Sequence, residues 1–137
     1  PGSQLHPDLL VEHQPGHATR FIKGDAACQS PDEDTSYTGA LAHNPDMNAL
    51  LPDWLRSHDV NDIYVAGLAL GDGGDNKLCV DSTATDLQDQ GFDVTVITDA
   101  TEAVIEANKQ LCLRRLGERG IRLMTTAQVI DMIEAQL

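Results

Sequence analysis

The stretch DIYVAGLALGDGGDNKLCVDSTATDLQDQGFDVTVITDA, residues 62–100, decides the fold of this chain. Its apolar run Ile63–Leu68 is typical of a buried strand, Val80–Gln90 has helical spacing, and Phe92–Thr98 alternates as a second strand. A glycine-rich turn joins the first strand to the helix and places Cys79 at the helix start. Backbone N–H groups and the positive end of the helix dipole stabilise a thiolate there, so Cys79 is a candidate nucleophile. The alternative is a small apolar residue buried under the sheet, because free cysteine is among the most buried residue types.

The alternation of strand and helix continues to the end of the chain. Three further elements are predicted: a helix over Glu102–Glu118, a strand over Ile121–Thr125 and a helix over Ala127–Gln136. Gly91 and Gly120 fall where helices should end, and Thr125 or Thr126 can cap the last helix. This order of elements predicts an α/β fold with a mostly parallel sheet.

The segment before residue 62 is less regular. Ala18–Lys23 is predicted to be a short strand, and Met47–His58 a helix that buries Leu50, Leu51, Trp54 and Leu55. Between them, Gly24–Pro45 is too polar to pack as an element. Loops of that length are usually functional or disordered, and we favour a functional loop.

Length and composition restrict the class of protein. A chain of 137 residues with 41% hydrophobic content is predicted to form one domain with an ordinary core. Its net charge of −13 argues against nucleic acid as a partner, since phosphate backbones are bound by basic surfaces. No membrane span or signal peptide is evident, and the three cysteines cannot all pair with one another. We therefore expect a soluble protein in a reducing, cytoplasmic setting.

Three segments in this order resemble the nicotinamidase and isochorismatase-like cysteine hydrolases. They are PGSQLHPDL at residues 1–9, FIKGDAACQSPDEDTSYTGA at 21–40, and the stretch from DIYVAGLAL through LCVDSTATDLQDQGFDVTVITDA. The similarity continues through ERGIRLMTTAQVI, so it covers nearly the whole chain. It implies a three-layer αβα fold around a mostly parallel sheet, which in that family is normally about six strands wide.

The resemblance also implies roles for single residues. Cys79 would be the nucleophile and Lys23 its electrostatic partner, while the backbone N–H groups of Ala69 and Cys79 would form an oxyanion hole. Family members have a cis peptide before the alanine, which maps to Leu68–Ala69. Tyr37 and Leu68 are the expected substrate-binding residues, although the chain is poor in aromatic residues for holding a pyridine ring. The remaining cysteines, Cys28 and Cys112, are interpreted as structural or incidental.

The chain departs from the family pattern at its N-terminal side. The family's catalytic aspartate lies on its first strand and its metal ligands on later upstream segments, and none of the three segments contains them. Residues 1–137 are therefore expected to form a single isochorismatase-like domain that lacks its N-terminal strands. We expect no cofactor in this chain, whereas zinc or another divalent metal belongs to the complete family site. His6, His13 and His17 could in principle bind zinc, but their spacing matches no closed motif and a polar loop is the simpler interpretation.

A second departure is the connector before Cys79. Residues 70–78 make it about six residues longer than the family's connector. Asp72, Asp75 and Asn76 could form a cation or ligand loop, although the full spacing of a calcium loop is lacking. The alternative is a tolerated flexible insertion.

The leading hypothesis is a nicotinamidase-like amidohydrolase that converts nicotinamide to nicotinate and ammonia through a cysteine thioester. As an isolated chain it is expected to be impaired or inactive, because the resemblance places the proton shuttle upstream. Two alternatives stay open: an isochorismatase-like hydrolase of another small amide, and a non-catalytic chain that uses an exposed sheet edge for interaction or assembly. The expected partners are thus a small amide substrate and a second copy or a complementing chain.

Overall fold

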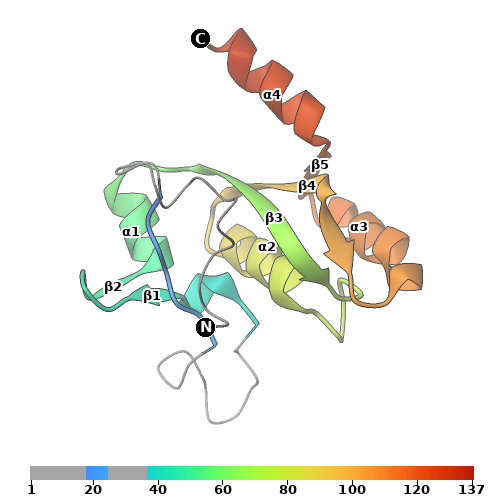
Figure 1. Cartoon of the computed structure of the whole chain (residues 1–137), viewed down its shortest axis with the longest axis horizontal. Helices are drawn as coiled ribbons and strands as arrows, with labels where there is room; N and C mark the ends of the chain where they lie inside the picture. The colour runs from blue at the N-terminus through green and yellow to red at the C-terminus, as the bar shows by residue number, and fades with distance from the viewer. Residues whose placement is uncertain (1–17, 25–36) are drawn as a thin grey trace, which may run out of the picture.

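The computed structural model describes residues 18–24 and 37–137 (Figure 1). Its centre is a parallel sheet of three strands in the order β3-β4-β5, with β3 at Asp62–Leu70, β4 at Asp93–Ala103 and β5 at Arg122–Met124. The crossovers between neighbouring strands contain α2 (Cys79–Asp89) and α3 (Lys109–Glu118). Both strand pairs are parallel, so the predicted α/β class is confirmed.

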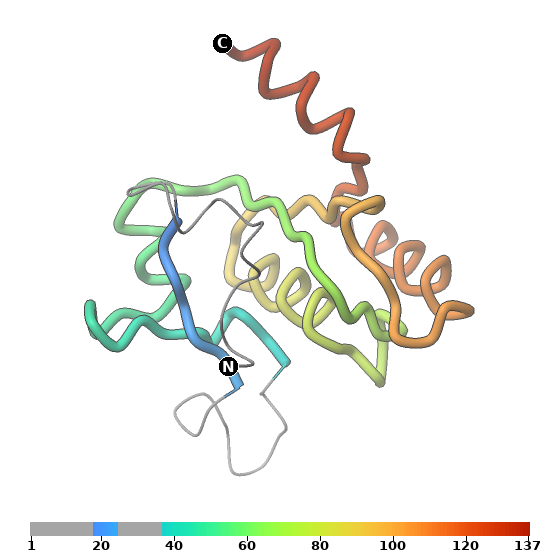
Figure 2. Tube along the Cα trace, viewed as in Figure 1, coloured from blue at the N-terminus to red at the C-terminus, as the bar shows by residue number. Residues whose placement is uncertain are grey.

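The hydrophobic core lies between this sheet and the two crossover helices. In the views of Figures 1 and 2, α2 and α3 lie side by side behind the strands, and both pack on the sheet. The strands contribute buried aliphatic side chains, and the helices contribute a matching set: Val65, Leu70, Val94 and Val96 against Val80, Ala84, Leu87, Leu113 and Leu116. Full burial of such a side chain stabilises the fold by about 1.5–3 kcal/mol. The core therefore holds α2 and α3, and the residues at their ends, firmly against the sheet.

Helix ends follow the predicted signals. Gly91 and Gly120 adopt φ values of +96° and +90° immediately after α2 and α3, where a side chain would be strained. Helix α4 (Thr126–Ala135) begins with a capping box, in which the Thr125 hydroxyl accepts from the Gln128 N–H and the Gln128 side chain accepts from the Thr125 N–H. These three predictions are confirmed.

The predicted boundary between β4 and α3 is wrong. Strand β4 runs on to Ala103, and after a 3-10 turn, η3 (Glu106–Asn108), helix α3 starts only at Lys109. After a first register shift Thr101 and Glu102 pair with Gly67 and Leu68, and after a second shift Ala103 pairs with Leu70. Backbone pairing across the sheet therefore overrides the helical spacing of this segment.

The segment before β3 also differs from the prediction. Only Ile22 of the predicted strand pairs, in an isolated antiparallel bridge with His43. The predicted helix is shortened to α1 (Leu51–Ser57), because β1 (His43–Asn44) and β2 (Ala49–Leu50) form a hairpin before it. Leu50 is 45% exposed rather than buried. The 3-10 turn η2 (Gly39–Leu41) lies within the predicted loop.

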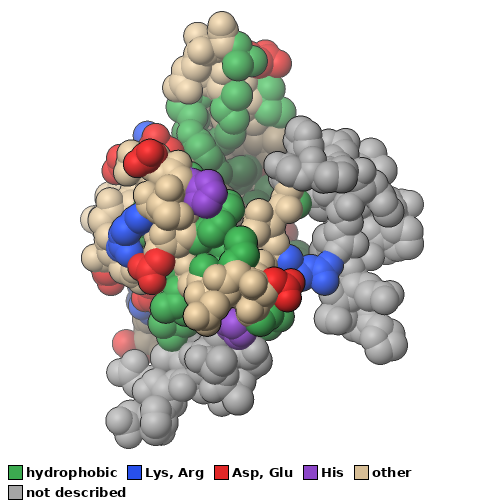
Figure 3. Space-filling view, turned by 90° about the vertical axis from the view of Figure 1, so that its left-hand side faces the viewer, with side chains coloured by type: hydrophobic (Ala, Val, Ile, Leu, Met, Phe, Trp, Pro, Cys, Tyr) green, Lys and Arg blue, Asp and Glu red, His purple; other side chains and the backbone are tan. Residues whose placement is uncertain are grey.

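Helix α4 extends away from the rest of the molecule (Figure 1). Its Val129 is buried, whereas Ile130 and Ile133 are about half exposed, and hydrophobic side chains line the projecting helix in Figure 3. No helix in the described part of the chain is long and apolar enough to cross a membrane.

Candidate functional site

Cys79 is the first residue of α2 and follows the connector that leaves β3. Its side chain is partly exposed, and the helix behind it is held in the core by Val80, Ala84 and Leu87. The first N–H groups of a helix have no partners within the helix, so this position offers hydrogen-bond donors and a positive dipole end to a negative group. The predicted location of Cys79 at the start of a helix is confirmed.

The side chain of Lys23 contacts the side chain of Cys79. Its Nζ lies 3.2 Å from Sγ of Cys79, although the two residues are 56 positions apart in the sequence. The preceding residue, Ile22, is anchored by two backbone hydrogen bonds with His43, which fixes the chain beside the lysine. Exposed ion pairs contribute little to stability, but an ammonium group beside a thiol favours the nucleophilic thiolate. The contact therefore adds little to the stability of the fold.

The end of β3, which leads into the connector before Cys79, is irregular. The pairing of β3 with β4 shifts register between Val65 and Gly67 and again between Leu68 and Leu70. Ala69 has a φ of +76°, a left-handed conformation that is uncommon for alanine and is found where the surroundings enforce it. The predicted cis peptide is wrong, since the described residues contain none. The chain instead changes direction through positive φ at Gly67 and Ala69, and it retains the lower-energy trans form of the peptide bond.

The two expected substrate-binding residues are accessible. Tyr37 is 38% exposed and Leu68 is 78% exposed. The turn after Tyr37 is tied to α2, because the Gly39 N–H donates to Oγ1 of Thr83 at 2.7 Å. The same hydroxyl donates to the carbonyl of Cys79 at 2.6 Å. Sequence reasoning missed Thr83, and its position four residues after Cys79, where a hydroxyl reaches back to the preceding turn, was the available signal.

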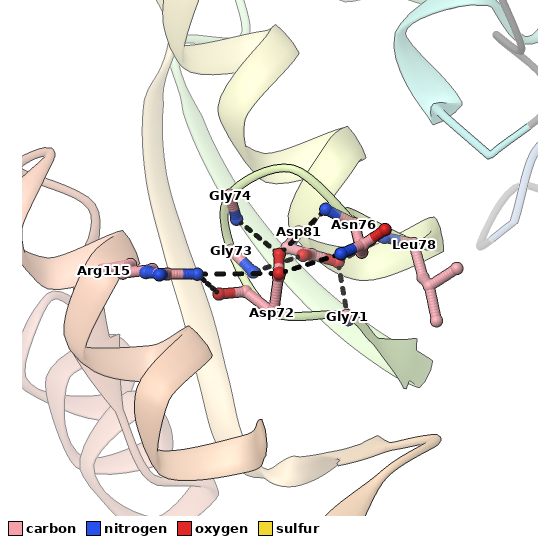
Figure 4. A network of polar contacts seen from close by, with 8 residues as sticks. All are labelled: Gly71, Asp72, Gly73, Gly74, Asn76, Leu78, Asp81 and Arg115. Atoms are coloured by element: carbon pink, nitrogen blue, oxygen red, sulfur yellow. Dashed lines mark hydrogen bonds and ion pairs between the residues drawn. The ribbon is translucent and has the colours of Figure 1, made fainter.

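The connector, residues 70–78, is a folded turn in which the carboxylate of Asp72 accepts hydrogen bonds from backbone N–H groups of the same turn. Asp72 accepts from the N–H groups of Gly74 and Asn76, and Arg115 of α3 donates to the Asp72 carbonyl at 2.8 Å (Figure 4). The hydrogen bond from Gly74 is the main cause that lowers the pKa of Asp72 below its ordinary value. The structure thus gives the connector a hydrogen-bonded arrangement around Asp72, and the cation loop and the tolerated insertion both stay predictions.

Asp81 is a second residue that sequence reasoning missed. It is fully buried in the first turn of α2 and accepts hydrogen bonds from Gly71, Gly73 and Leu78. An acidic residue three positions after a helix N-cap, such as Leu78 here, was the signal that could have revealed it.

The remaining residues singled out from the sequence are Cys112, Cys28 and three histidines. Cys112 is buried in α3, where burial and then the charge and hydrogen bond of Asp81 raise the pKa of its thiol to about 12. The burial of Cys112 in the core agrees with its interpretation as structural or incidental. Cys28 and the three histidines His6, His13 and His17 lie outside the described residues. Within the described ranges, no three His, Cys, Asp or Glu side chains are grouped to hold a metal ion, so the donor set does not fit the divalent metal of the family.

Comparison with known proteins decides the family. The sequence model of the protein family described as the isochorismatase domain matches residues 24–128 of this chain. This chain belongs to the isochorismatase family. The matched range begins immediately after Lys23 and includes Cys79, so the predicted family is confirmed from Gly24 through the capping box of α4.

Individual relatives agree with this assignment. The nicotinamidase of Escherichia coli (strain K12) is 36% identical over 103 residues, which cover 75% of this chain and 42% of that protein. Isochorismatase family protein 2B of Dictyostelium discoideum is 38% identical over 58 residues, 42% of this chain and 27% of that protein. The solved structure of an isochorismatase-like hydrolase from Alkaliphilus metalliredigens shares the fold, with a TM-score of 0.51 at 23% identity over 60% of this chain and 42% of its own. The chain therefore spans less than half the length of each of these proteins.

Proposed function

We propose that this isochorismatase-family chain is a nicotinamidase-like amidohydrolase in which Cys79 is the nucleophile. The observation that carries the proposal is the 3.2 Å contact between the Lys23 ammonium and the Cys79 sulfur, at the N-terminus of a helix. The 36% identity to a nicotinamidase supports the amide class of substrate.

The chemistry follows from this arrangement. The thiolate attacks the carboxamide carbon, forming a C–S bond, and the N–H groups of Ala69 and Cys79 hold the resulting oxyanion. The C–N bond then breaks and ammonia leaves with an added proton. Water attacks the thioester carbon, the C–S bond breaks, and nicotinate and the free thiol are released.

Proton transfer to the ammonia needs a group other than the Cys79–Lys23 pair. The family resemblance assigns it to an aspartate upstream of the matched segments, so we expect the chain alone to turn over slowly or not at all. The described residues give no donor set for a metal, and no step of the proposal passes through one. Tyr37 and Leu68 offer exposed apolar surface for the pyridine ring.

The proposal is tested with pyridine-3-carbaldehyde, the aldehyde counterpart of nicotinamide. A thiol adds to an aldehyde without a leaving group, so the probe reports the nucleophile and its ring recognition apart from ammonia release. It should protect Cys79 from iodoacetamide at lower concentration than benzaldehyde does, by a larger factor than it protects the thiol of free glutathione, as measured by mass spectrometry of the alkylated Cys79 peptide. The absence of protection by either aldehyde would contradict a nucleophilic Cys79, and equal protection would remove the pyridine ring from the proposal.

A further inference from the structure

Asp81 is the only acidic side chain that is buried among the described residues, with no exposed surface at all. A buried carboxylate is costly unless hydrogen bonds replace its lost hydration, so its position needs a structural reason. It lies two residues after Cys79, in the same first turn of α2.

Its partners come from both ends of the connector. Oδ1 accepts from the N–H of Gly71 at 3.0 Å and from that of Leu78 at 2.9 Å, and Oδ2 accepts from Gly73 at 3.0 Å. Figure 4 shows the carboxylate enclosed by the turn that these residues form. One side chain therefore ties the exit of β3 to the residue immediately before Cys79.

The connector has little freedom to move around this carboxylate. A side chain at Gly71 would overlap the carbonyl oxygen of Asn76, and one at Gly73 would lie 3.1 Å from the carbonyl oxygen of Cys112 in α3. Arg115 of α3 holds the outer side of the connector through the Asp72 carbonyl. The long turn is thus clamped between α2 and α3, with Asp81 at its centre.

We propose that Asp81 is a positioning residue for Cys79. By holding the Leu78 N–H it fixes the Lys77–Leu78 peptide, one residue before the nucleophile, and through it the direction of the thiol toward Lys23 and of the Cys79 N–H toward substrate. This inference rests on the proposed function. Shifts of about 1 Å in such groups are enough to lower reaction rates on the order of a hundredfold.

The direction in which the reactivity of Cys79 changes when Asp81 is replaced distinguishes a positioning role of Asp81 from an effect of its charge. The negative charge of Asp81 opposes a thiolate two residues away, so its removal would by charge alone make Cys79 more reactive. Removal of its hydrogen bonds would make Cys79 less reactive, because the turn before it is no longer held. A lower reactivity after Asp81→Asn therefore reports position.

The experiment measures iodoacetamide alkylation of Cys79 at pH 7 and at a series of higher pH values, in the full chain. Asp81→Asn should lower the rate at pH 7 at least fivefold, whereas Asp75→Asn, which removes the same charge from an exposed site on the same connector, should change it less than twofold. An unchanged or faster rate in folded Asp81→Asn protein would overturn the proposal.

A second measurement needs no variant and applies if Asp81→Asn does not fold. In the wild-type protein, the amides of Gly73 and Leu78 should exchange with solvent at least tenfold more slowly than those of Gly74 and Asn76, whose acceptor Asp72 is more exposed. Equal exchange rates would overturn the proposal. Failure of the proposed function would be seen in a different experiment, in which neither aldehyde protects Cys79 of the wild-type protein from iodoacetamide.

Discussion

The two cysteines that the structure describes lie on neighbouring helices in opposite environments. Cys79 is partly exposed at the start of α2, 3.2 Å from the Lys23 ammonium, whereas Cys112 is fully buried in α3 beside the Asp81 carboxylate. A positive neighbour favours a thiolate and a negative neighbour in an apolar core opposes it. The two residues are of the same type, and what distinguishes their thiols is the charged neighbour of each: Lys23 beside Cys79 and Asp81 beside Cys112.

Asp81 connects the two environments. The same carboxylate that raises the pKa of the Cys112 thiol holds the turn leading to Cys79. Asp81 and the connector that it holds are therefore common to the environments of both thiols.

The largest effect is expected for Gly71→Ala. A new Cβ would overlap the Asn76 carbonyl within the connector, which cannot shift without breaking its bonds to Asp81. We expect the free energy of unfolding to fall by about 3 kcal/mol, measured by urea denaturation.

The matched control for this change is Gly117→Ala in α3. Its Cβ would be in ordinary contact with Leu123 at 3.5 Å, and alanine is the better helix former, so stability should rise by about 0.5–1 kcal/mol. Equal stability of the two variants would mean that the connector is not clamped.

Alkaline pH should unfold the protein partly through Cys112. Because burial and the charge of Asp81 raise the pKa of this thiol from 9.0 to about 12, the folded protein keeps the proton that the unfolded chain loses. This contribution to stability is present below pH 9 and is lost as the pH rises toward 12. The melting temperature, measured across that pH range, should fall less steeply with rising pH in Cys112→Ala than in the wild type. Cys79→Ala is the control for a partly exposed thiol. Parallel curves for wild-type and Cys112→Ala protein would contradict the assignment.

A smaller effect is expected for Thr83→Val. The shape of the side chain is kept, but the hydroxyl that joins Gly39 to the Cys79 carbonyl is lost. Stability should fall by about 1 kcal/mol, and the amide of Gly39 should exchange faster. Unchanged exchange of the Gly39 amide would show that Thr83 does not hold the Tyr37 turn against α2.

The sequence predicted the elements whose signals are local. Periodicity located β3, α2, β5 and α4 and placed Cys79 at a helix start, because apolar spacing and glycine ends act within a few residues. It did not predict the length of β4, since Thr101–Ala103 are held by pairing with β3 rather than by their own propensities. The approach of Lys23 to Cys79 came from family resemblance alone, because no local rule joins residues 56 positions apart. Asp81 was missed because an acidic residue at a helix start is ordinarily solvated, and only the folded connector buries it.

Site-resolved alkylation of the folded chain at pH 7 tests directly whether Lys23 activates Cys79. Iodoacetamide should modify Cys79 at least a hundredfold faster than Cys112, as followed by mass spectrometry of the two peptides. Lys23→Gln should slow the modification of Cys79 at least fivefold, whereas Lys77→Gln, whose ammonium contacts Thr85 instead, should leave it within twofold. Similar rates at the two cysteines, or an equal effect of the two lysine variants, would contradict the claim that Lys23 activates Cys79.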